Sequence, residues 1–182
     1  MSEEFLDLDG VDPDNLNDRL TEGRYQFLIQ SCAVDDKGTH TVAAEVVAAK
    51  EQRMLGKIHN FKFWEVKPHN GDPEQIRKNS ITMSTRLKFL MSCGAVTLDE
   101  LRQAKTDGKK VRVDWSKCVG GFFFSELKKD KKGYLNPSYG SYYKDSDHEV
   151  SSRPNEWPVP VPMQVRAEMA ARVAAANAEL DF

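Results

Sequence analysis

The sequence has few cysteines, no long hydrophobic run and no zinc-finger spacing, and each absence excludes a class of protein. Its three cysteines, Cys32, Cys93 and Cys118, include no C-x-x-C pair, and their odd number argues against a disulfide framework. The four histidines lie near no cysteine at zinc-finger spacing, so we expect no structural zinc site and no other cofactor. A reducing cytoplasm is therefore the expected setting.

Membrane-spanning and targeting segments are also lacking. The longest apolar runs, residues 42–49 and 120–124, fall far short of the roughly 20 residues that a membrane-spanning helix needs. The first residues are acidic, whereas a signal peptide begins with a basic region followed by an apolar one, so we expect no signal peptide. Together these features predict a cytoplasmic protein without a membrane partner.

Motifs of the common enzyme classes are missing as well. The chain has no G-x-S-x-G, no phosphate-binding glycine loop with GK[ST] and no H-E-x-x-H. Glu65 and Lys67 do have the acid-x-lysine form of Mg-dependent nucleases, in which a carboxylate binds the metal and a lysine orients water. The second acidic ligand would have to be Asp35, Asp36 or Glu45, none of which has a supporting motif. We therefore expect no enzymatic activity, with the nuclease as a second alternative.

The small net charge of −2 conceals an uneven distribution. Residues 1–23 carry a net charge of −7, residues 24–150 carry +6 and residues 151–182 carry −1. A basic body between acidic ends favours a polyanion-binding core whose tails are repelled by the ligand or compete with it. The alternative is that the acidic tails only keep the protein in solution.

Apolar side chains alternate with a period of two in three segments, residues 24–30, 42–48 and 57–64. A turn at residues 35–38 separates the first two segments and indicates a hairpin. The third segment is closed by residues 67–73, which contain two prolines and therefore disfavour a continued ladder. This pattern predicts a meander of three antiparallel strands.

A period of 3.6 follows over residues 74–91 and predicts a helix with Gly94 as its stop. Thr97 and Glu100 have the spacing of a capping box, which predicts a second, short helix through Lys105. These two helices separate the meander from the remaining strands.

Strand periodicity returns at residues 110–115 and continues or restarts after a glycine pair at residues 120–125. A charged hairpin loop, residues 127–134, then leads to a last strand near residues 139–144. Three strands, a helix and two more strands are the element order of an OB fold. We therefore predict a mainly β protein, an OB-fold-like five-stranded Greek-key barrel with a helix between strands 3 and 4, while a split barrel or small α+β sheet is the alternative.

The ends of the chain differ from this central domain. Residues 1–22 are predicted to be an acidic flexible arm, residues 23–150 the nucleic-acid-binding domain, and residues 151–182 a Pro-rich linker with an amphipathic helix. The apolar stripe of that helix can pack on the barrel or on another subunit, which leaves a homo-oligomer open.

Basic and aromatic residues are interleaved on the third predicted strand. Alternation places Phe61 and Phe63 on one face and Lys62 and Trp64 on the other. Lysines neutralise phosphates and exposed rings stack on bases, so this pattern predicts a single-stranded nucleic acid bound with little sequence specificity. The alternative is that the rings belong to the hydrophobic core and that the lysines are only solvated surface side chains. The expected nucleic-acid-binding residues are Lys57, Lys62, Trp64, Arg112, Lys128, Lys129, Lys131, Lys132, Tyr134 and Tyr139.

Several short motifs occur in the order seen in one known family. They are Gly23-Arg24-Tyr25, Gly56-Lys57, Lys67-Pro68-His69-Asn70, Arg86-Leu87, Gly108-Lys109-Lys110-Val111-Arg112-Val113 and Gly133-Tyr134. With them, roughly residues 22–145 resemble a family of phage and prophage proteins that are encoded near recombination genes and regarded as OB-fold single-stranded DNA-binding proteins. The resemblance implies DNA binding in replication or recombination.

The last five residues, 178–182, are similar to the acidic tip, ending in phenylalanine, by which bacterial single-stranded DNA-binding proteins recruit enzymes. The resemblance implies that Leu180, Asp181 and Phe182 bind a replication or recombination enzyme. The alternative is the frayed end of a helix. For the whole protein, the alternative of a different class is a protein-interaction module on a small β-barrel.

Overall fold

The structure, a computed structural model, describes residues 19–180 apart from residues 112 and 139. Most of the predicted acidic arm therefore lies outside the described residues. The same holds for four predicted site residues, Arg112, Tyr139, Asp181 and Phe182, and the side chain of Leu180 is not described either.

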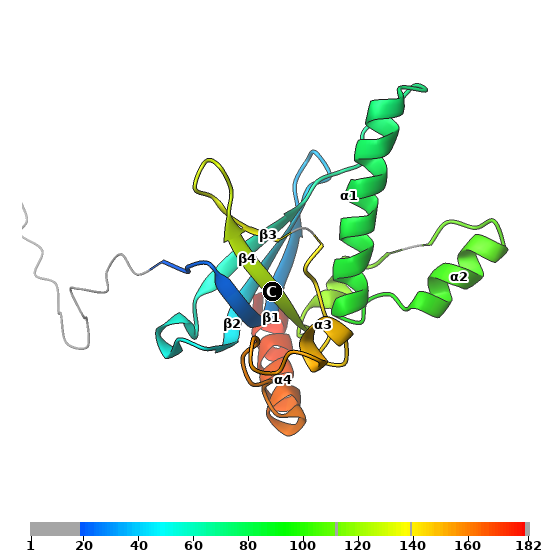
Figure 1. The fold of residues 1–182 in the computed structure, drawn as a ribbon. Helices are drawn as coiled ribbons and strands as arrows, with labels where there is room; N and C mark the ends of the chain where they lie inside the picture. Colours follow the sequence, from blue (N-terminus) through cyan, green and yellow to red (C-terminus); the bar gives the residue numbers. More distant parts are fainter. Residues whose placement is uncertain (1–18, 112, 139, 181–182) are drawn as a thin grey trace, which may run out of the picture.

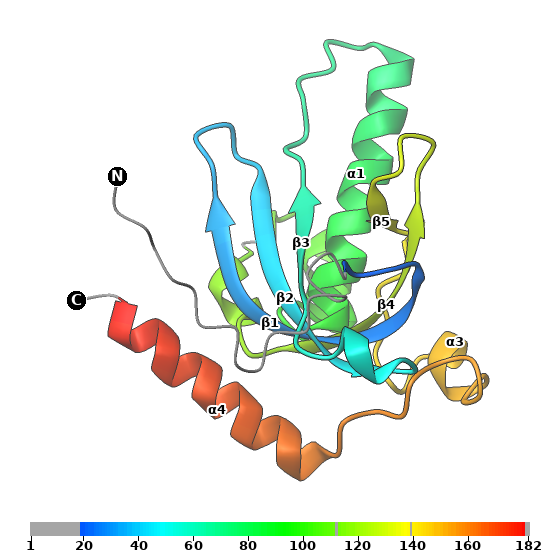
Figure 2. The same ribbon diagram turned by 90° about the vertical axis from the view of Figure 1, so that its left-hand side faces the viewer.

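Five antiparallel strands form one strongly curved sheet, which is a nearly closed barrel (Figures 1 and 2). Their order is β3-β2-β1-β4-β5, so that β1 pairs with both β2 and β4. This pairing and the helical segment between β3 and β4 confirm the predicted OB-like, mainly β fold. The strands are β1 (Gly23–Val34), β2 (His40–Ala49), β3 (Ile58–Phe63), β4 (Phe122–Lys129) and β5 (Leu135–Pro137).

The helices begin and end close to where the sequence predicts. The Asp72 side chain accepts a hydrogen bond from the backbone N–H of Glu74 and caps the first helix, and Thr97 and Glu100 form the predicted capping box of the second. Gly94 has a φ of +78°, which favours glycine after a helix end. The helices are α1 (Pro73–Ser92), α2 (Leu98–Thr106), α3 (His148–Ser151) and α4 (Met163–Leu180), with 3-10 turns at Gln52–Met54 and Trp115–Cys118.

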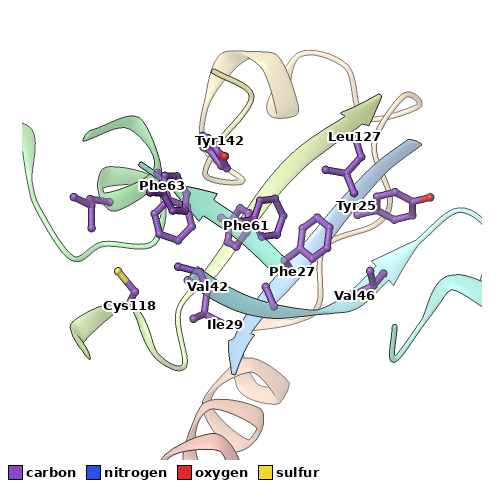
Figure 3. Close-up of a cluster of buried hydrophobic side chains, with 14 of the residues drawn as sticks. Tyr25, Phe27, Ile29, Val42, Val46, Phe61, Phe63, Cys118, Leu127 and Tyr142 are labelled. Atoms are coloured by element: carbon purple, nitrogen blue, oxygen red, sulfur yellow. The ribbon is translucent and has the colours of Figure 1, made fainter. Parts of the chain in front are cut away.

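Aromatic rings from four elements fill the inside of the barrel (Figure 3). Phe27 of β1 lies 5.1 Å from Phe61 of β3 and 5.3 Å from Phe123 of β4, measured between ring centroids. Phe89, in the last turns of α1, lies 5.2 Å from Phe123 and 4.5 Å from Phe63. The C-terminal turns of α1 therefore close one end of the barrel, while its N-terminal half extends beyond the sheet (Figure 1).

The outer face of β1 and β4 is covered by the C-terminal part of the chain. Trp157 packs edge-on against Phe124 of β4, with 5.7 Å between the ring centroids, and its indole N–H donates to the Glu149 carbonyl. Val173 of α4 is buried, and α4 lies under the sheet in Figure 2. The segment predicted as a linker thus packs on the barrel, and so does the predicted helix. None of the helices in the described part of the chain is long and apolar enough to span a membrane.

Of the fourth predicted strand, the part at residues 120–125 is confirmed by β4, whereas the part at residues 110–115 and the last predicted strand are wrong. The described residues between 109 and 114 form no ladder, and Trp115–Cys118 is a 3-10 turn, because the Asp114 side chain accepts from the N–H of Ser116 and caps that turn. The last strand is Leu135–Pro137 rather than residues 139–144, and among residues 140–144 only Tyr143 forms a bridge, with Phe124. Gly140, with a φ of +65°, interrupts extended backbone at that point.

Removal of a core ring should destabilise the barrel far more than removal of an outward neighbour. Phe61 is 1 % exposed and touches rings of two other strands, so we expect Phe61→Ala to lower the free energy of unfolding by about 3–5 kcal/mol. Ile58 lies on the same strand but is 51 % exposed, and Ile58→Ala should cost under about 1 kcal/mol. Urea denaturation measures both; equal losses would contradict the assignment of inward and outward faces.

Candidate nucleic-acid interface

One half of the outer surface of the barrel is open. On β1 and β4, the outward side chains Gln26, Leu28 and Phe124 are buried under the C-terminal part of the chain. On β3, the outward side chains Asn60 and Lys62 are exposed. The β2–β3 face, together with the loops between β1 and β2 and between β4 and β5, is where OB folds bind oligonucleotides. The fold thus leaves open the face on which such ligands bind.

The alternation predicted for β3 is confirmed in detail. Phe61 and Phe63 are 1 % and 2 % exposed and belong to the core, whereas Lys62 is exposed and the Trp64 ring is 62 % exposed. Lys62 pairs across the strands with Thr41 of β2. β3 therefore carries an exposed cation near its end, and an exposed ring follows directly after the strand. Lys57 is half-buried and precedes the other end of that strand.

The loop between β1 and β2 is built around the carboxylate of Asp35. This carboxylate accepts hydrogen bonds from the backbone N–H groups of Lys37, at 2.9 Å, and Thr39, at 2.8 Å. These bonds, that from Thr39 above all, hold the pKa of Asp35 below its ordinary value. Gly38 has a φ of +73°, and a Cβ at this position would lie 2.8 Å from a carboxylate oxygen of Glu65, so no other residue fits easily.

The loop between β4 and β5 repeats this design with Asp130. Its carboxylate accepts from the backbone N–H groups of Lys132, at 2.8 Å, and Tyr134, at 2.9 Å, and Gly133 has a φ of +83°. The two turns share the motif Asp-x-Lys-Gly, at residues 35–38 and 130–133. Hydrophobic periodicity does not reveal this motif. Both loops thus present a lysine at the same turn position.

The two loops differ in the side chains that they carry at equivalent turn positions. In the loop between β4 and β5, Lys131 stands where the other loop has Asp36, and Tyr134, 66 % exposed, stands where the other has Thr39. Lys129 is also exposed, whereas Lys128 forms an ion pair with Glu126 at 3.3 Å. The β4–β5 hairpin is therefore the more basic and aromatic of the two loops.

Both loops and the segment that follows β3 lie at one end of the barrel (Figures 1 and 2). The structure therefore brings the end of β3, with Lys62 and Trp64, and the β4–β5 hairpin, with its lysines and Tyr134, to the same rim. It separates Lys57 from that rim, because β3 runs between them. Residues 112 and 139 of the predicted set are outside the described residues.

A stack of three side chains near this rim was not predicted. The rings of His40 and Trp115 are parallel within 10° and 4.2 Å apart, and the Arg86 guanidinium lies 5.4 Å from the Trp115 ring. Trp115 and Arg86 also line a groove of about 430 Å³ between α1 and the segment before the 3-10 turn. Trp115 was expected on a strand, and only the tertiary packing shows its neighbours.

The nuclease alternative gains no support from the described residues. No group of three histidine, cysteine, aspartate or glutamate side chains in the described part of the chain could hold a metal ion. Of the candidate second ligands to a metal at Glu65, Asp35 is engaged by its own loop, and Glu45 accepts a hydrogen bond from Gln30 at 2.6 Å. Within residues 19–180 as described, the acid-x-lysine motif belongs to no group of three side chains that could hold a metal ion.

A comparison of the chain with protein-family models finds no match, and a comparison with curated proteins finds none either. The phage family to which the sequence is similar therefore remains a prediction based on short motifs.

The stacked His40 should make folding depend on pH. Burial, aided by the charge of Arg86, lowers the pKa of His40 below its ordinary value of 6.5, although Asp35 and Glu65 oppose the shift. A depressed folded-state pKa gives stability that is complete above pH 6.5 and is lost as the pH falls through the folded value. We expect the urea midpoint of the wild type to fall more than that of His40→Gln between about pH 7.5 and about pH 5.5.

The matched control for this measurement is His69→Gln, because His69 is exposed. It should retain the pH dependence of the wild type. Identical pH profiles for His40→Gln and the wild type would show that His40 is not the group responsible.

Proposed function

We propose that the protein is a non-catalytic, cytoplasmic single-stranded DNA-binding protein of phage type that acts in replication or recombination. The observation that carries this proposal is the open β2–β3 face of an OB-like barrel. At the end of β3, Lys62 and the exposed ring of Trp64 lie at the same rim as the β4–β5 hairpin. The roles in replication and recombination rest on the resemblance of the sequence to the phage family.

The charges on the rim support binding to a phosphate backbone. Lys62, Lys129, Lys131 and Lys132 are exposed and form no ion pair among the described residues. The carboxylate of Asp130, between them, is engaged by backbone N–H groups of its own loop. Each lysine that contacts a phosphate releases a condensed counterion, which makes such binding sensitive to salt and independent of base sequence.

The two exposed rings support a preference for single strands. Trp64 is 62 % and Tyr134 is 66 % exposed, and both stand beside lysines rather than in the core. An unpaired base can stack on such a ring, whereas the bases of a duplex are already stacked on one another. Rings and lysines together therefore favour a single-stranded polyanion with bases over a duplex and over a polyanion without bases.

Partner recruitment through Leu180, Asp181 and Phe182 is part of the proposal and rests on the similarity of the tip. The α4 helix packs on the barrel, where the side chain of Asn177 donates to the Gln30 carbonyl at 3.0 Å. The tip therefore begins where a helix anchored to the barrel ends. The ring and carboxylates of such a tip are the groups that an apolar pocket with a basic rim on a partner enzyme would recognise.

Loss of either exposed ring should weaken binding of single-stranded DNA. We expect Trp64→Ala and Tyr134→Ala each to reduce affinity for labelled oligo(dT) by about 1–3 kcal/mol with little change in salt dependence. Fluorescence anisotropy at two salt concentrations, with duplex competitor, measures this. The control is Val159→Ala, because Val159 is 85 % exposed on the covered side of the barrel. An unchanged affinity for both ring variants would refute stacking on these residues.

Loss of the hairpin lysines should instead change the salt dependence. For single strands, each phosphate contact contributes about 0.7 to the slope of log K against log salt, so Lys131→Ala combined with Lys132→Ala should flatten the slope by about 1.4. Lys105 of α2 and Lys109, just after α2, are also exposed, and α2 lies away from the rim in Figure 1, so their double alanine variant should keep the slope. A wild-type slope in the hairpin variant would mean that the DNA takes another path.

Heparin distinguishes this function from a protein-interaction module, because it is a polyanion without bases. The proposal predicts that oligo(dT) binds more tightly than heparin and that Trp64→Ala reduces only the DNA affinity. Absence of any oligo(dT) binding at low salt would refute the proposed function and favour a polypeptide ligand on the β2–β3 face.

A further inference from the structure

The three cysteines, which are far apart in the sequence, converge at one place in the fold. Cys32 is on β1, Cys93 directly follows α1, and Cys118 ends the 3-10 turn before β4. The sulfur atoms of Cys93 and Cys118 are 3.4 Å apart. The pKa of Cys32 is lowered, above all by its interaction with Cys118. Cys118 is fully buried between the two partly exposed thiols.

The backbone holds Cys93 and Cys118 together. The N–H of Cys93 donates to the Phe89 carbonyl, and the N–H of Gly121 donates to the Cys118 carbonyl at 2.9 Å. A Cβ at Gly121 would lie 2.8 Å from the Cys118 carbonyl oxygen and 3.1 Å from the Cys93 Cβ. Any larger residue there would push the two cysteines apart, so the close approach of the thiols depends on glycine at this position.

Cys93, unlike Cys118 and Cys32, lines a surface pocket of about 400 Å³ beside α4. Gln26 also lines the pocket, and its side-chain Nε2 is buried without a hydrogen-bond partner among the described residues. Lys144 and Arg166 add positive charge, although Arg166 is paired with Asp145 at 2.9 Å. The ammonium group of Lys144 favours a small anionic molecule, such as one that carries carboxylates.

The thiols have different acidities, which gives them different roles. The interaction with the Cys118 thiol lowers the pKa of Cys93 below its ordinary value, and the charge of Lys144 adds to this shift, although burial opposes it. Interactions with the other two thiols, together with burial, raise the pKa of Cys118 far above its ordinary value. Cys93 is therefore the thiol suited to attack, and Cys118 the thiol that stays protonated until it is needed.

We propose that Cys93 and Cys118 are a reversible dithiol pair that is oxidised by a small disulfide carrying carboxylates, bound in the pocket beside α4. The Cys93 thiolate attacks one sulfur of the ligand, the ligand S–S bond breaks, and one small thiol leaves with the proton from Cys93. Cys118 then attacks the Cys93 sulfur of this mixed disulfide, and the second small thiol leaves with the proton from Cys118. Two protein thiols are oxidised to one disulfide, and one small disulfide is reduced to two thiols.

Oxidised glutathione, an anionic disulfide, is the probe for this site. Incubation of the native full-length protein should reduce the number of free thiols from three to one, and peptide mapping should find Cys93 joined to Cys118. Cys118→Ser should stop at a mixed disulfide on Cys93, whereas Cys32→Ser should still form the bond. Three free thiols after incubation, or a bond between Cys32 and Cys118, would overturn the proposal, and neither outcome depends on a variant that folds.

The pocket has its own test, because charge selects the ligand. Lys144→Ala should slow the reaction with oxidised glutathione by up to about fivefold and leave the reaction with cystamine, a cationic disulfide of similar reactivity, unchanged or faster. Equal slowing with both disulfides would show that the lysine acts on the thiol alone and that the pocket does not bind the ligand. Both measurements are independent of DNA binding.

Discussion

The contact of Phe27 with Phe61 and Phe123 is the interaction on which the rest of the structure depends. It joins the middle of β1 to β3 and β4, which belong to opposite halves of the curved sheet. Because side chains on a strand alternate, the burial of Phe61 and Phe63 inside the barrel places Lys62 and Trp64 outside. The candidate binding face is thus a direct consequence of how the core is packed.

The second constraint is the unequal covering of the barrel. β1 is buried on both faces, since Tyr25, Phe27 and Ile29 face the core and Gln26 and Leu28 lie under the C-terminal segment. This segment anchors through specific contacts, such as the Val161 N–H that donates to the Gln26 side chain at 2.7 Å. The same covering forms the wall of the pocket next to Cys93. The C-terminal segment therefore leaves the β2–β3 face open and forms one wall of the pocket.

The sequence predicted best the features that depend on local periodicity. The alternation on β3, the capping box at Thr97 and the helix at residues 163–178 each follow from neighbours within a few residues, and each is confirmed. The prediction of a strand at residues 110–115 was wrong because Val111, Val113 and Trp115 are apolar for another reason. They line the groove against α1, and alternation alone does not separate these two causes.

The convergence of the cysteines and the placement of the rim loops lay beyond prediction from the sequence. Cys32, Cys93 and Cys118 have no common spacing, and only the pairing of β1 with β4 and the close approach at Gly121 bring them together. Likewise, the hairpin lysines and Trp64 meet at one rim because of the strand order, which element order alone leaves open. On β3 the individual residues were assigned correctly to their faces, but the residues of other elements that lie beside them were not predicted.

The two rim loops explain how a chain with a net charge of −2 can have a basic rim. Asp35 and Asp130 each place a carboxylate where backbone N–H groups of the same turn bind it, so their charge stabilises the turn at short range. The lysine two residues after each aspartate donates its backbone N–H to that carboxylate. Its side chain takes no part in these bonds. Because Asp36 in the first loop corresponds to Lys131 in the second, the rim is more acidic beside β2 and more basic beside β4. A bound polyanion should therefore enter between Trp64 and the β4–β5 hairpin rather than over the loop between β1 and β2.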